Sequence, residues 1–271
     1  MLNSSFAEFP LVVPRHAFSS RDAARAGDVW RAFQEVAVHA STLAGWPPER
    51  YRAEGAAFVV RGMRVVHRRE LRYGEPTVGQ TWVSRVRKGF LSTREVRLVA
   101  GGEAIAAATQ EWVHVRADVS IAPASAALIE AFPPEVRGDD VPALDRGGPV
   151  GGPERSFEFG CWHTWMDPLA HANHPVYVDW CEEAIARVLH GAGIDPARVV
   201  PVAEEAAYRS AVVAPDAVCV KTRPVGRTSE GALVFQHEVL SRGEIAAKVT
   251  MVRRLDGDDG VAMASAFEVE A

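Results

Sequence analysis

Residues 162–184 hold the densest group of reactive side chains in this chain of 271 residues. Asp167, His171, Asn173 and His174 occupy eight positions directly ahead of an apolar segment. The spacing of its apolar residues predicts a helix over 174–189. The start of a helix has N–H groups without intrahelical partners, and its dipole favours negative charge. A carboxylate beside such an oxyanion site is suited to acyl transfer, with Asp167 as nucleophile or general base.

Each of these residues also has an ordinary structural explanation. Asp167 precedes a proline and could simply close an Asx turn, and Asn173 could cap the helix. We predict that Asp167, His171 and Asn173 are catalytic. His171 would orient the carboxylate, polarise the carbonyl or protonate the departing thiol, and Asn173 would cap the helix, bind the substrate or do both.

Composition excludes several other classes of function. The net charge of −5 and the pI near 6.0 argue against nucleic acid as the main partner. Five arginines between residues 61 and 72 could meet phosphates or an acidic carrier protein, although a solvated strand face is the commoner use of such a run. Three cysteines without CxxC spacing indicate small core residues in a reducing compartment.

We expect a cytoplasmic protein that contacts no membrane. The first residues lack the basic and apolar regions of a secretory signal, and the chain has no apolar run long enough to span a bilayer. His163, Asp167, His171 and His174 carry ligand atoms that zinc or iron accepts. Because their spacing fits no recognised ligand motif, we expect no metal and no cofactor.

The chain reads as two copies of one unit. The segment 133–154 is rich in Pro, Gly and Asp and predicts a linker between a first domain, 1–132, and a second, 155–271. Each part begins with a loop and an amphipathic helix. At an offset of 147 residues Glu35 aligns with Glu182, and at an offset of 141 Thr109 aligns with Thr250. Because the offset falls from 147 in the helices to 141 in the strands, we expect a longer connection after the second helix.

Alternation of apolar and polar residues predicts four strands after each helix. They cover 57–71, 80–88, 92–100 and 103–116 in the first part, and 206–214, 217–224, 232–241 and 244–254 in the second. Such a sheet buries the helix only by wrapping around it. The sequence therefore predicts an α+β protein of two tandem hotdog domains, each a long helix wrapped by an antiparallel sheet.

The first copy lacks the reactive side chains. At the offset of 147, Ser20, Ala24 and Ala26 align with Asp167, His171 and Asn173. We therefore expect the first domain to do no chemistry and to supply part of an acyl pocket. Glu182 is a candidate helical carboxylate, but a Glu present in both copies is more simply structural.

From Asp167 to Tyr177, followed by Glu182, the sequence resembles hotdog thioesterases of the 4-hydroxybenzoyl-CoA thioesterase type, whose motif is Asp-x-x-Gly-His-Val-Asn-Asn-x-x-Tyr. The doubled chain is similar to the acyl-acyl-carrier-protein thioesterases of plants and bacteria, whose first helix reads Gln-Glu-x-Ala, as in residues 34–37 here. Residues 81–84 and 108–113 are also similar to strands of that family.

This resemblance implies hydrolysis of an acyl-CoA or acyl-carrier-protein thioester. Because a tandem pair already supplies two hotdog domains, we expect a monomer or a homodimer. We also expect substrate-binding roles for four residues: Trp165, Leu169, His174 and Tyr177. The chain departs from the pattern in several places. Ala170 replaces the usual Gly, His174 replaces the second Asn, and Trp165 stands where many relatives have Asp.

Two catalytic groups of the plant-type enzymes are missing. Leu169 stands in place of a catalytic Asn, and residues 208–212 lack the Glu-Cys pair that follows Tyr-Arg in those enzymes. Two alternatives therefore stay open. One is an acyltransferase, hydratase or cyclase that acts on a carrier-bound acyl intermediate, and the other is a non-catalytic acyl-binding protein.

Overall fold

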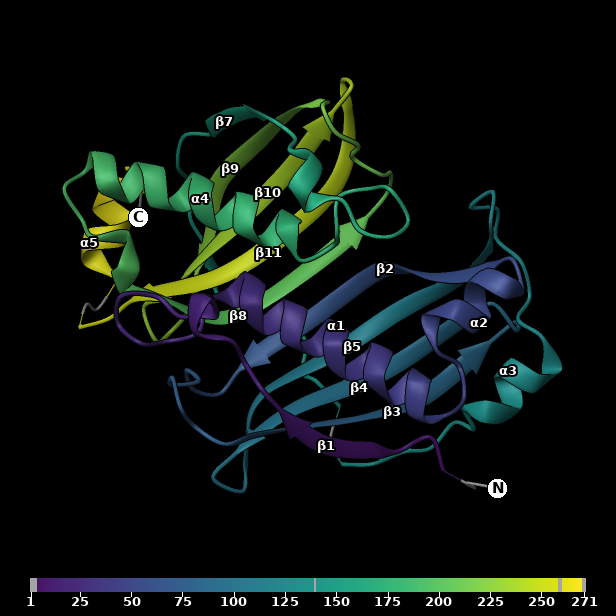
Figure 1. Ribbon diagram of the computed structural model, residues 1–271. Helices are drawn as coiled ribbons and strands as arrows, with labels where there is room; N and C mark the ends of the chain where they lie inside the picture. The colour runs from purple at the N-terminus through teal and green to yellow at the C-terminus, as the bar shows by residue number, and fades with distance from the viewer. Residues whose placement is uncertain (1–3, 139, 258–259, 270–271) are drawn as a thin grey trace. The chain divides into compact units, whose positions relative to one another are not determined.

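The computed structural model describes residues 4–138, 140–257 and 260–269 (Figure 1). The chain folds as two units. Unit 1 contains the residues up to Ala17 and residues 29–142, and unit 2 contains residues 18–28 and those from Ala143 onward. The division between residues 142 and 143 falls inside the predicted linker, 133–154. One residue of this linker, Asp139, is not among the described residues. Each unit has a long helix and an antiparallel sheet, which confirms the predicted α+β class of two hotdog units.

Unit 1 has one sheet in the order β1-β3-β4-β5-β2, with antiparallel neighbours throughout. Its strands are β1 (Ala7–Leu11), β2 (Ala56–His67), β3 (Thr77–Arg87), β4 (Leu91–Ala100) and β5 (Glu103–Arg116). Its helices are α1 (Ala26–Leu43), whose first three residues belong to unit 2, α2 (Pro48–Ala53) and α3 (Ala126–Ala131), with a 3-10 turn η1 (Arg15–Ala17).

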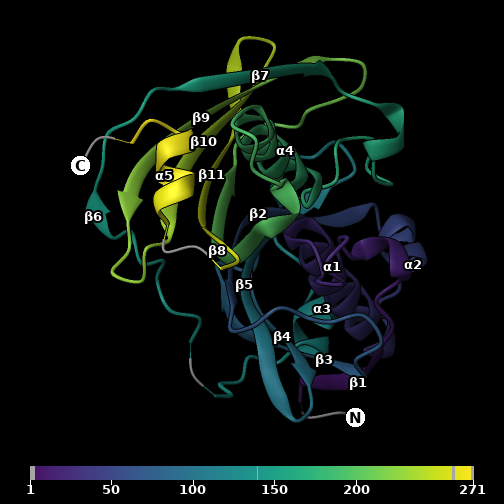
Figure 2. The same ribbon diagram turned by 90° about the vertical axis from the view of Figure 1, so that its left-hand side faces the viewer.

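Unit 2 has the antiparallel order β8-β11-β10-β9, and two further strands, β6 and β7, pair with β9. The strands are β6 (Gly148–Pro149), β7 (Arg155–Gly160), β8 (Val199–Tyr208), β9 (Ala217–Arg227), β10 (Leu233–Ser241) and β11 (Glu244–Leu255). The helices are α4 (Val176–Gly191) and α5 (Val261–Ala266), with 3-10 turns η2 (His163–Trp165) and η3 (Pro196–Arg198). Figure 2 looks along α4 and shows the strands curving around it.

Several predicted bounds were wrong. The second helix covers 176–191 instead of 174–189, because Pro175 is its N-cap. The strand expected at 206–214 is β8, which ends at Tyr208 because the next two N–H groups both donate to Ala246 O. Three strands, β1, β6 and β7, and three short helices, α2, α3 and α5, were not predicted. The connection after the second helix is shorter than the first one, which contains α2, so the expected lengthening was also wrong.

The structure corrects the alignment of the two copies at the helix. The loop before each helix and the helix itself correspond at an offset of 148, and the strands β2–β5 and β8–β11 correspond at 141. Complementary packing supports this register. A Cβ on Gly79 of β3 would lie 2.4 Å from Val36 of α1, so the large side chain is on the helix. The equivalent residues of unit 2 are Val220 and Ala184, with the large side chain on the strand.

A buried ion cluster connects α4 to its sheet. Arg253 of β11 has no exposed side-chain surface and donates through Nε to Glu182 of α4. Its Nη1 lies 2.6 Å from the carboxylate of Glu204 of β8, which is also fully buried. Burial alone would lower the pKa of Arg253, but the two carboxylates raise it above its usual value. The equivalent residues of unit 1 are Gln34, Met63 and Trp112, so the fold forms without these charges.

His237 of β10 is a second buried polar residue of unit 2. Its Nδ1 lies 2.9 Å from Thr222 Oγ1, and it has no exposed surface. Burial, with a smaller contribution from Arg253, lowers its pKa to about 3. The equivalent pair in unit 1 is Val96 and Thr81.

We predict that Arg253→Met is strongly destabilising because it leaves the Glu204 carboxylate buried without its cation. The expected cost is about 3–5 kcal/mol of unfolding free energy, measured by urea denaturation. The triple change Glu182→Gln, Glu204→Met, Arg253→Met removes all three charges and should recover most of that loss. A triple variant less stable than the single one would contradict this account.

We also predict that His237 makes the protein less stable as the pH falls below 6.5. The unfolded chain binds a proton on this imidazole below roughly pH 6.5 while the folded chain resists it down to about pH 3. Unfolding free energy should therefore fall by up to about 1.4 kcal/mol per pH unit in this window. Denaturation at pH 7.5 and pH 5.5 should show a smaller loss for His237→Val, which introduces the residue found at this position in unit 1. An equal loss in both proteins would show that His237 does not carry the effect.

Candidate functional site

The loop before α4 is closed by backbone hydrogen bonds. Asp167 N–H donates to His171 O at 2.8 Å, and Ala170 N–H donates to Asp167 O at 2.9 Å. Met166 and Ala172 form an isolated antiparallel bridge across its base. Ala170 has a φ of 61° at the tip, a conformation that costs a non-glycine residue energy. This conformation explains the Gly of the family motif at this position, since Gly adopts it freely.

The loop holds the carboxylate of Asp167 beside the imidazole of His171. Asp167 Oδ1 accepts a hydrogen bond from Leu169 N–H at 2.8 Å, which closes the expected Asx turn. Asp167 Oδ2 lies 3.3 Å from His171 Nδ1, and these side chains are 12% and 24% exposed. The two oxygens thus have different surroundings: one is bound to the backbone, and the other lies next to an ionisable ring that solvent can reach.

The first copy has the same loop with different side chains. Ser19 N–H donates to Ala23 O at 2.8 Å, Arg21 N–H donates to Ser19 Oγ at 3.3 Å, and Asp22 has a φ of 55° at the tip. Ser19 and Ala23 are therefore the counterparts of Asp167 and His171, one residue before the predicted Ser20 and Ala24. Arg25 likewise replaces the predicted Ala26 as the counterpart of Asn173. The correction preserves the conclusion that this backbone needs neither a carboxylate nor an imidazole.

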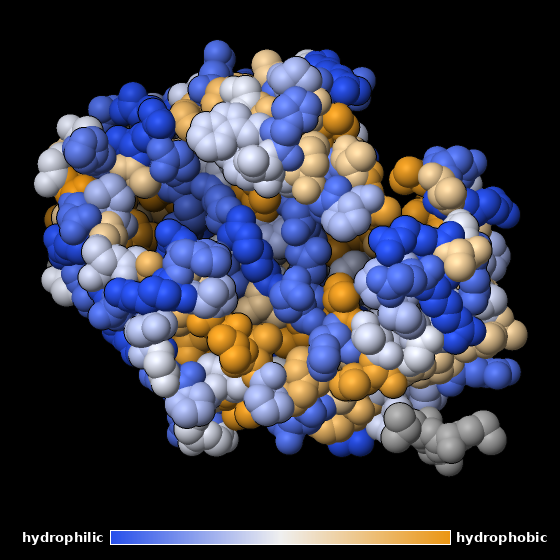
Figure 3. Space-filling model, in the orientation of Figure 1, coloured by the Kyte–Doolittle hydropathy of each residue, from blue (hydrophilic) through white to orange (hydrophobic). Residues whose placement is uncertain are grey.

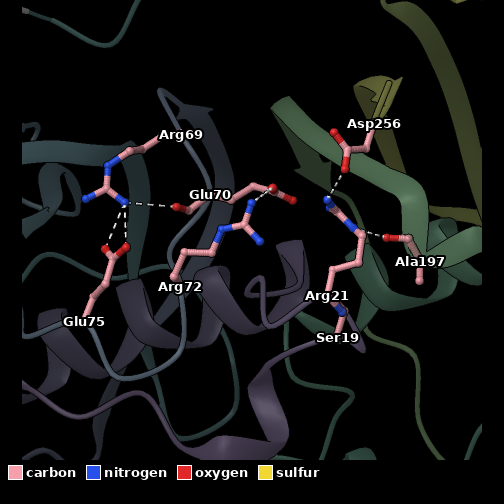
Figure 4. A network of polar contacts seen from close by, with 8 residues as sticks. All are labelled: Ser19, Arg21, Arg69, Glu70, Arg72, Glu75, Ala197 and Asp256. Carbon is pink, nitrogen blue, oxygen red and sulfur yellow. Dashed lines mark hydrogen bonds and ion pairs between the residues drawn. The ribbon is translucent and has the colours of Figure 1, made fainter. Parts of the chain in front are cut away.

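The two loops differ in what they contact. Residues 18–28 belong to unit 2, where Arg21 donates through Nε to Ala197 O and pairs with Asp256 at 3.0 Å (Figure 4). Its counterpart in the second loop is Leu169, which is 43% exposed. The first loop is thus anchored by an arginine, whereas the tip beside Asp167 reaches solvent.

An aromatic cluster lies beside the loop. Trp165 stacks on Trp162 with ring centroids 4.8 Å apart and contacts Phe159 and Trp180 at 5.8 and 5.5 Å. Trp162 is 63% exposed, while Trp180 is buried. Trp165 therefore belongs to a wall of rings that extends from the core to solvent, a place compatible with its predicted position near the substrate.

Tyr177 and Tyr208 join the start of α4 to the end of β8. Tyr177 Oη accepts a hydrogen bond from Val212 N–H at 3.1 Å, and Tyr208 Oη donates to His174 O at 2.8 Å. Burial raises the pKa of Tyr177 to about 12, and Asp167 contributes a smaller increase. The tyrosines thus act as neutral supports of the loop. Tyr208 was not singled out from the sequence, where nothing but its place before Arg209 distinguishes it.

The start of α4 differs from the expectation in its capping. The N-cap is Pro175, which offers no side-chain cap, so Asn173 does not cap the helix. Val176 N–H donates to Asn173 O, and Val178 N–H donates to Pro175 O. These two N–H groups are therefore not free to hold an oxyanion, although the positive end of the helix dipole still lies here.

Glu182 does not join Asp167 and His171. It lies in the second turn of α4 and is bound to the buried Arg253. In the corrected register its counterpart is Gln34, and Glu35 corresponds to Glu183, so the Glu is not shared between the copies as the sequence suggested. The structure gives Glu182 a role in the ion cluster beneath the helix.

The remaining candidate groups have structural surroundings. Cys161 and Cys181 are buried, Cys219 is half-buried, and burial raises the pKa of all three thiols. In the arginine-rich segment of unit 1, Arg69 pairs with Glu75 at 2.9 Å and Arg72 with Glu70 at 3.1 Å (Figure 4).

Two further properties concern the described part of the chain as a whole. It contains no group of three or more His, Cys, Asp or Glu side chains placed to hold a metal ion. None of its helices has the length and apolar character needed to cross a bilayer. The face drawn in Figure 3 is largely hydrophilic, with apolar residues gathered where the chain leads from β1 to α1.

A comparison with protein families finds a match for the part of the chain that contains this loop. Residues 161–257 match the family model described as the thioesterase-like superfamily. Among curated protein sequences none matches this chain significantly.

Solved structures share the whole fold at low sequence identity. A putative oleoyl thioesterase from Lactobacillus plantarum has a TM-score of 0.80 and 16% identity, over 95% of this chain and 99% of that one. An acyl-ACP thioesterase from Bacteroides thetaiotaomicron has a TM-score of 0.71 and 14% identity, over 92% and 98% of the chains. The 12:0-ACP thioesterase from Umbellularia californica has a TM-score of 0.72 and 15% identity, over 94% and 96%. Residues 161–257 are thus similar to the thioesterase-like superfamily, within a chain that has the double-hotdog fold.

Proposed function

We propose that this chain hydrolyses an acyl thioester of coenzyme A or of an acyl carrier protein, and that Asp167 is its catalytic carboxylate. The observation that carries the proposal is the position of that carboxylate, which the loop holds beside His171 at the start of α4. The first copy of the loop keeps the same backbone with Ser19 and Ala23, so the acid and the imidazole are not needed for folding. The match of residues 161–257 to the thioesterase-like superfamily supports the same reaction.

The chemistry needs few groups. The Asp167 carboxylate either takes a proton from a water molecule while the water oxygen bonds to the thioester carbonyl carbon, or attacks that carbon itself and forms a mixed anhydride that a water molecule then hydrolyses. The carbonyl oxygen becomes negative and is stabilised at the positive end of the α4 dipole. The C–S bond then breaks, and the thiolate leaves readily because a thiol has a pKa of roughly 8.5.

The neighbouring residues position the reacting groups. His171 lies against Asp167 Oδ2 and orients the carboxylate. Asn173 and His174 are half-buried on the short segment between the loop and α4, where they contribute polar contacts to the thioester. The exposed ring of Trp162 and the exposed side chain of Leu169 supply an apolar approach to the carboxylate.

We further propose that unit 1 takes no part in bond breaking and that its role is to bind ligand. The loop that leads into α1 has Ser19 at the position of Asp167 and is anchored through Arg21. We propose the domains predicted from the sequence, 1–132 and 155–271, as the non-catalytic and the catalytic part.

We predict that Asp167→Asn lowers kcat/KM for thioester hydrolysis by about 10²–10⁴-fold. The amide keeps the acceptor for Leu169 N–H but is neither a base nor a nucleophile. Release of free thiol from acyl-CoA substrates of increasing chain length measures the rate, and thermal unfolding verifies that the variant folds.

Asp195→Asn is a matched control. Asp195 accepts a hydrogen bond from Ala197 N–H at 2.9 Å at the start of η3, so it has the same local role without an adjacent imidazole. Its variant should retain the wild-type rate. If Asp167→Asn hydrolyses thioesters as fast as the wild type, the carboxylate is not the catalytic group.

A further inference from the structure

Unit 1 has a buried arginine, Arg94, at a strand position whose neighbours on the same face are apolar. Arg94 lies on β4 with the same alternation as Val96 and Leu98, which have no exposed surface. Its side chain thus enters the interior of the unit, and Arg94 as a whole is 8% exposed.

The guanidinium of Arg94 has few polar contacts. Nη1 donates to Thr81 Oγ1 at 3.3 Å, and the group lies 5.3 Å from the centre of the Phe132 ring. Within the described part of the chain, no carboxylate lies at ion-pair distance from Arg94. On the opposite face of the same strand, Arg97 has such a partner in Glu95 at 3.7 Å. Burial lowers the pKa of Arg94 to about 10, so the group stays charged at neutral pH.

The surroundings of Arg94 combine an apolar wall with a few polar groups. The wall is a core cluster of buried residues from three parts of the unit: Trp46, Val83, Leu128 and Phe132. Tyr51 of α2 packs on this cluster and shares a hydrogen bond with Ser41 at 3.0 Å. Gln110 of β5 is directly opposite Arg94 in register and has no exposed surface. Figure 1 shows α2 and α3 at the same end of the sheet, where they flank this interior.

Unit 2 shows that the fold does not need this charge. The counterpart of Arg94 is Phe235, which packs on Phe267 with ring centroids 4.7 Å apart. The counterpart of Gln110 is Met251. Both residues are fully buried. The same architecture is therefore built once with an apolar pair and once with an arginine and an amide.

An unpaired buried cation is costly, because the protein interior does not replace the water that it loses. An anion that enters the site would supply the missing partner, and a carboxylate matches the fork of a guanidinium. We propose that Arg94 is the recognition residue of a ligand site inside unit 1, which binds the carboxylate of an organic acid whose apolar body packs against the Trp46–Phe132 cluster. This site goes beyond the proposed function, which places the chemistry at Asp167.

Isothermal titration with dodecanoate tests the site, with dodecanol as the uncharged probe. The wild type should bind dodecanoate, and Arg94→Met should weaken its binding at least tenfold while leaving dodecanol unchanged. Arg94→Lys keeps the charge and should retain part of the affinity. Arg87→Met is the matched control, since Arg87 is an exposed arginine of β3 paired with Glu111, and it should bind as the wild type does.

Thermal unfolding separates ligand recognition from a structural role. Without ligand, Arg94→Met should have a Tm equal to or above that of the wild type, because it removes an unpaired buried charge. Dodecanoate should raise the Tm of the wild type and not that of the variant. The proposal is overturned if the variant binds dodecanoate with unchanged affinity, or if the wild type does not bind it.

The carboxylate could belong to a free acid or to the far end of a thioester substrate. Hydrolysis of lauroyl-CoA and of the mono-CoA thioester of dodecanedioic acid distinguishes these sources. A substrate carboxylate predicts that Arg94→Met lowers kcat/KM at least tenfold for the diacid thioester alone. A free acid predicts that the variant changes only the response of the rate to added dodecanoate. If the wild type hydrolyses neither thioester, the proposed function fails, and the binding measurements still decide the fate of this site.

Discussion

The loop between Asp167 and His171 is the constraint on which the site depends. Its shape comes from backbone hydrogen bonds and from a left-handed residue at its tip, so the side chains on it are free to vary. One copy of the loop carries a carboxylate and an imidazole, whereas the other carries Ser19 and Ala23 and is anchored through Arg21. A duplicated unit can in this way place reactive groups in one copy without altering the fold of either.

The duplication also serves as an internal reference for buried charge. Where unit 2 has Arg253 between Glu182 and Glu204, unit 1 has uncharged residues. Where unit 1 has Arg94, unit 2 has Phe235. The two arginines differ in one respect that matters: Arg253 is neutralised by its own chain, and Arg94 is not. The buried Arg253 joins α4 to its sheet through its two carboxylates, whereas the buried Arg94 is the residue that we propose to bind a ligand.

Much of the fold was readable from the sequence because its signals are local and periodic. The α1 and α4 spacing, the strand β5 and the Gly-containing turns before β5 and β11 predicted two similar units. The reactive loop was also found, because Asp167 and His171 are rare neighbours. The one-residue error in the alignment of the copies arose because the two loops share hydrogen bonds but not side chains. Only the backbone shows that Ser19 stands for Asp167.

Other features could not be found from periodicity. Arg94 lies between Thr93 and Glu95, so the segment reads as a solvent-facing strand, and its burial depends on contacts with residues distant in sequence such as Phe132. The bond of Tyr208 to His174 O joins residues 34 apart and leaves no local pattern. Side-chain direction and long-range contact, rather than element type, were the missing information.

The proposed role of Asp167 requires its carboxylate, or a water molecule bound to it, to lie next to the thioester carbonyl. A crystal structure with a bound acyl-CoA analogue tests this requirement. In the analogue a methylene group replaces the thioester sulfur, so the carbonyl group is kept and the C–C bond beside it cannot be hydrolysed. We expect an Asp167 oxygen, or a water bound to it, within about 3.5 Å of the carbonyl carbon, with the carbonyl oxygen toward the start of α4. A carbonyl group bound away from Asp167 would contradict it.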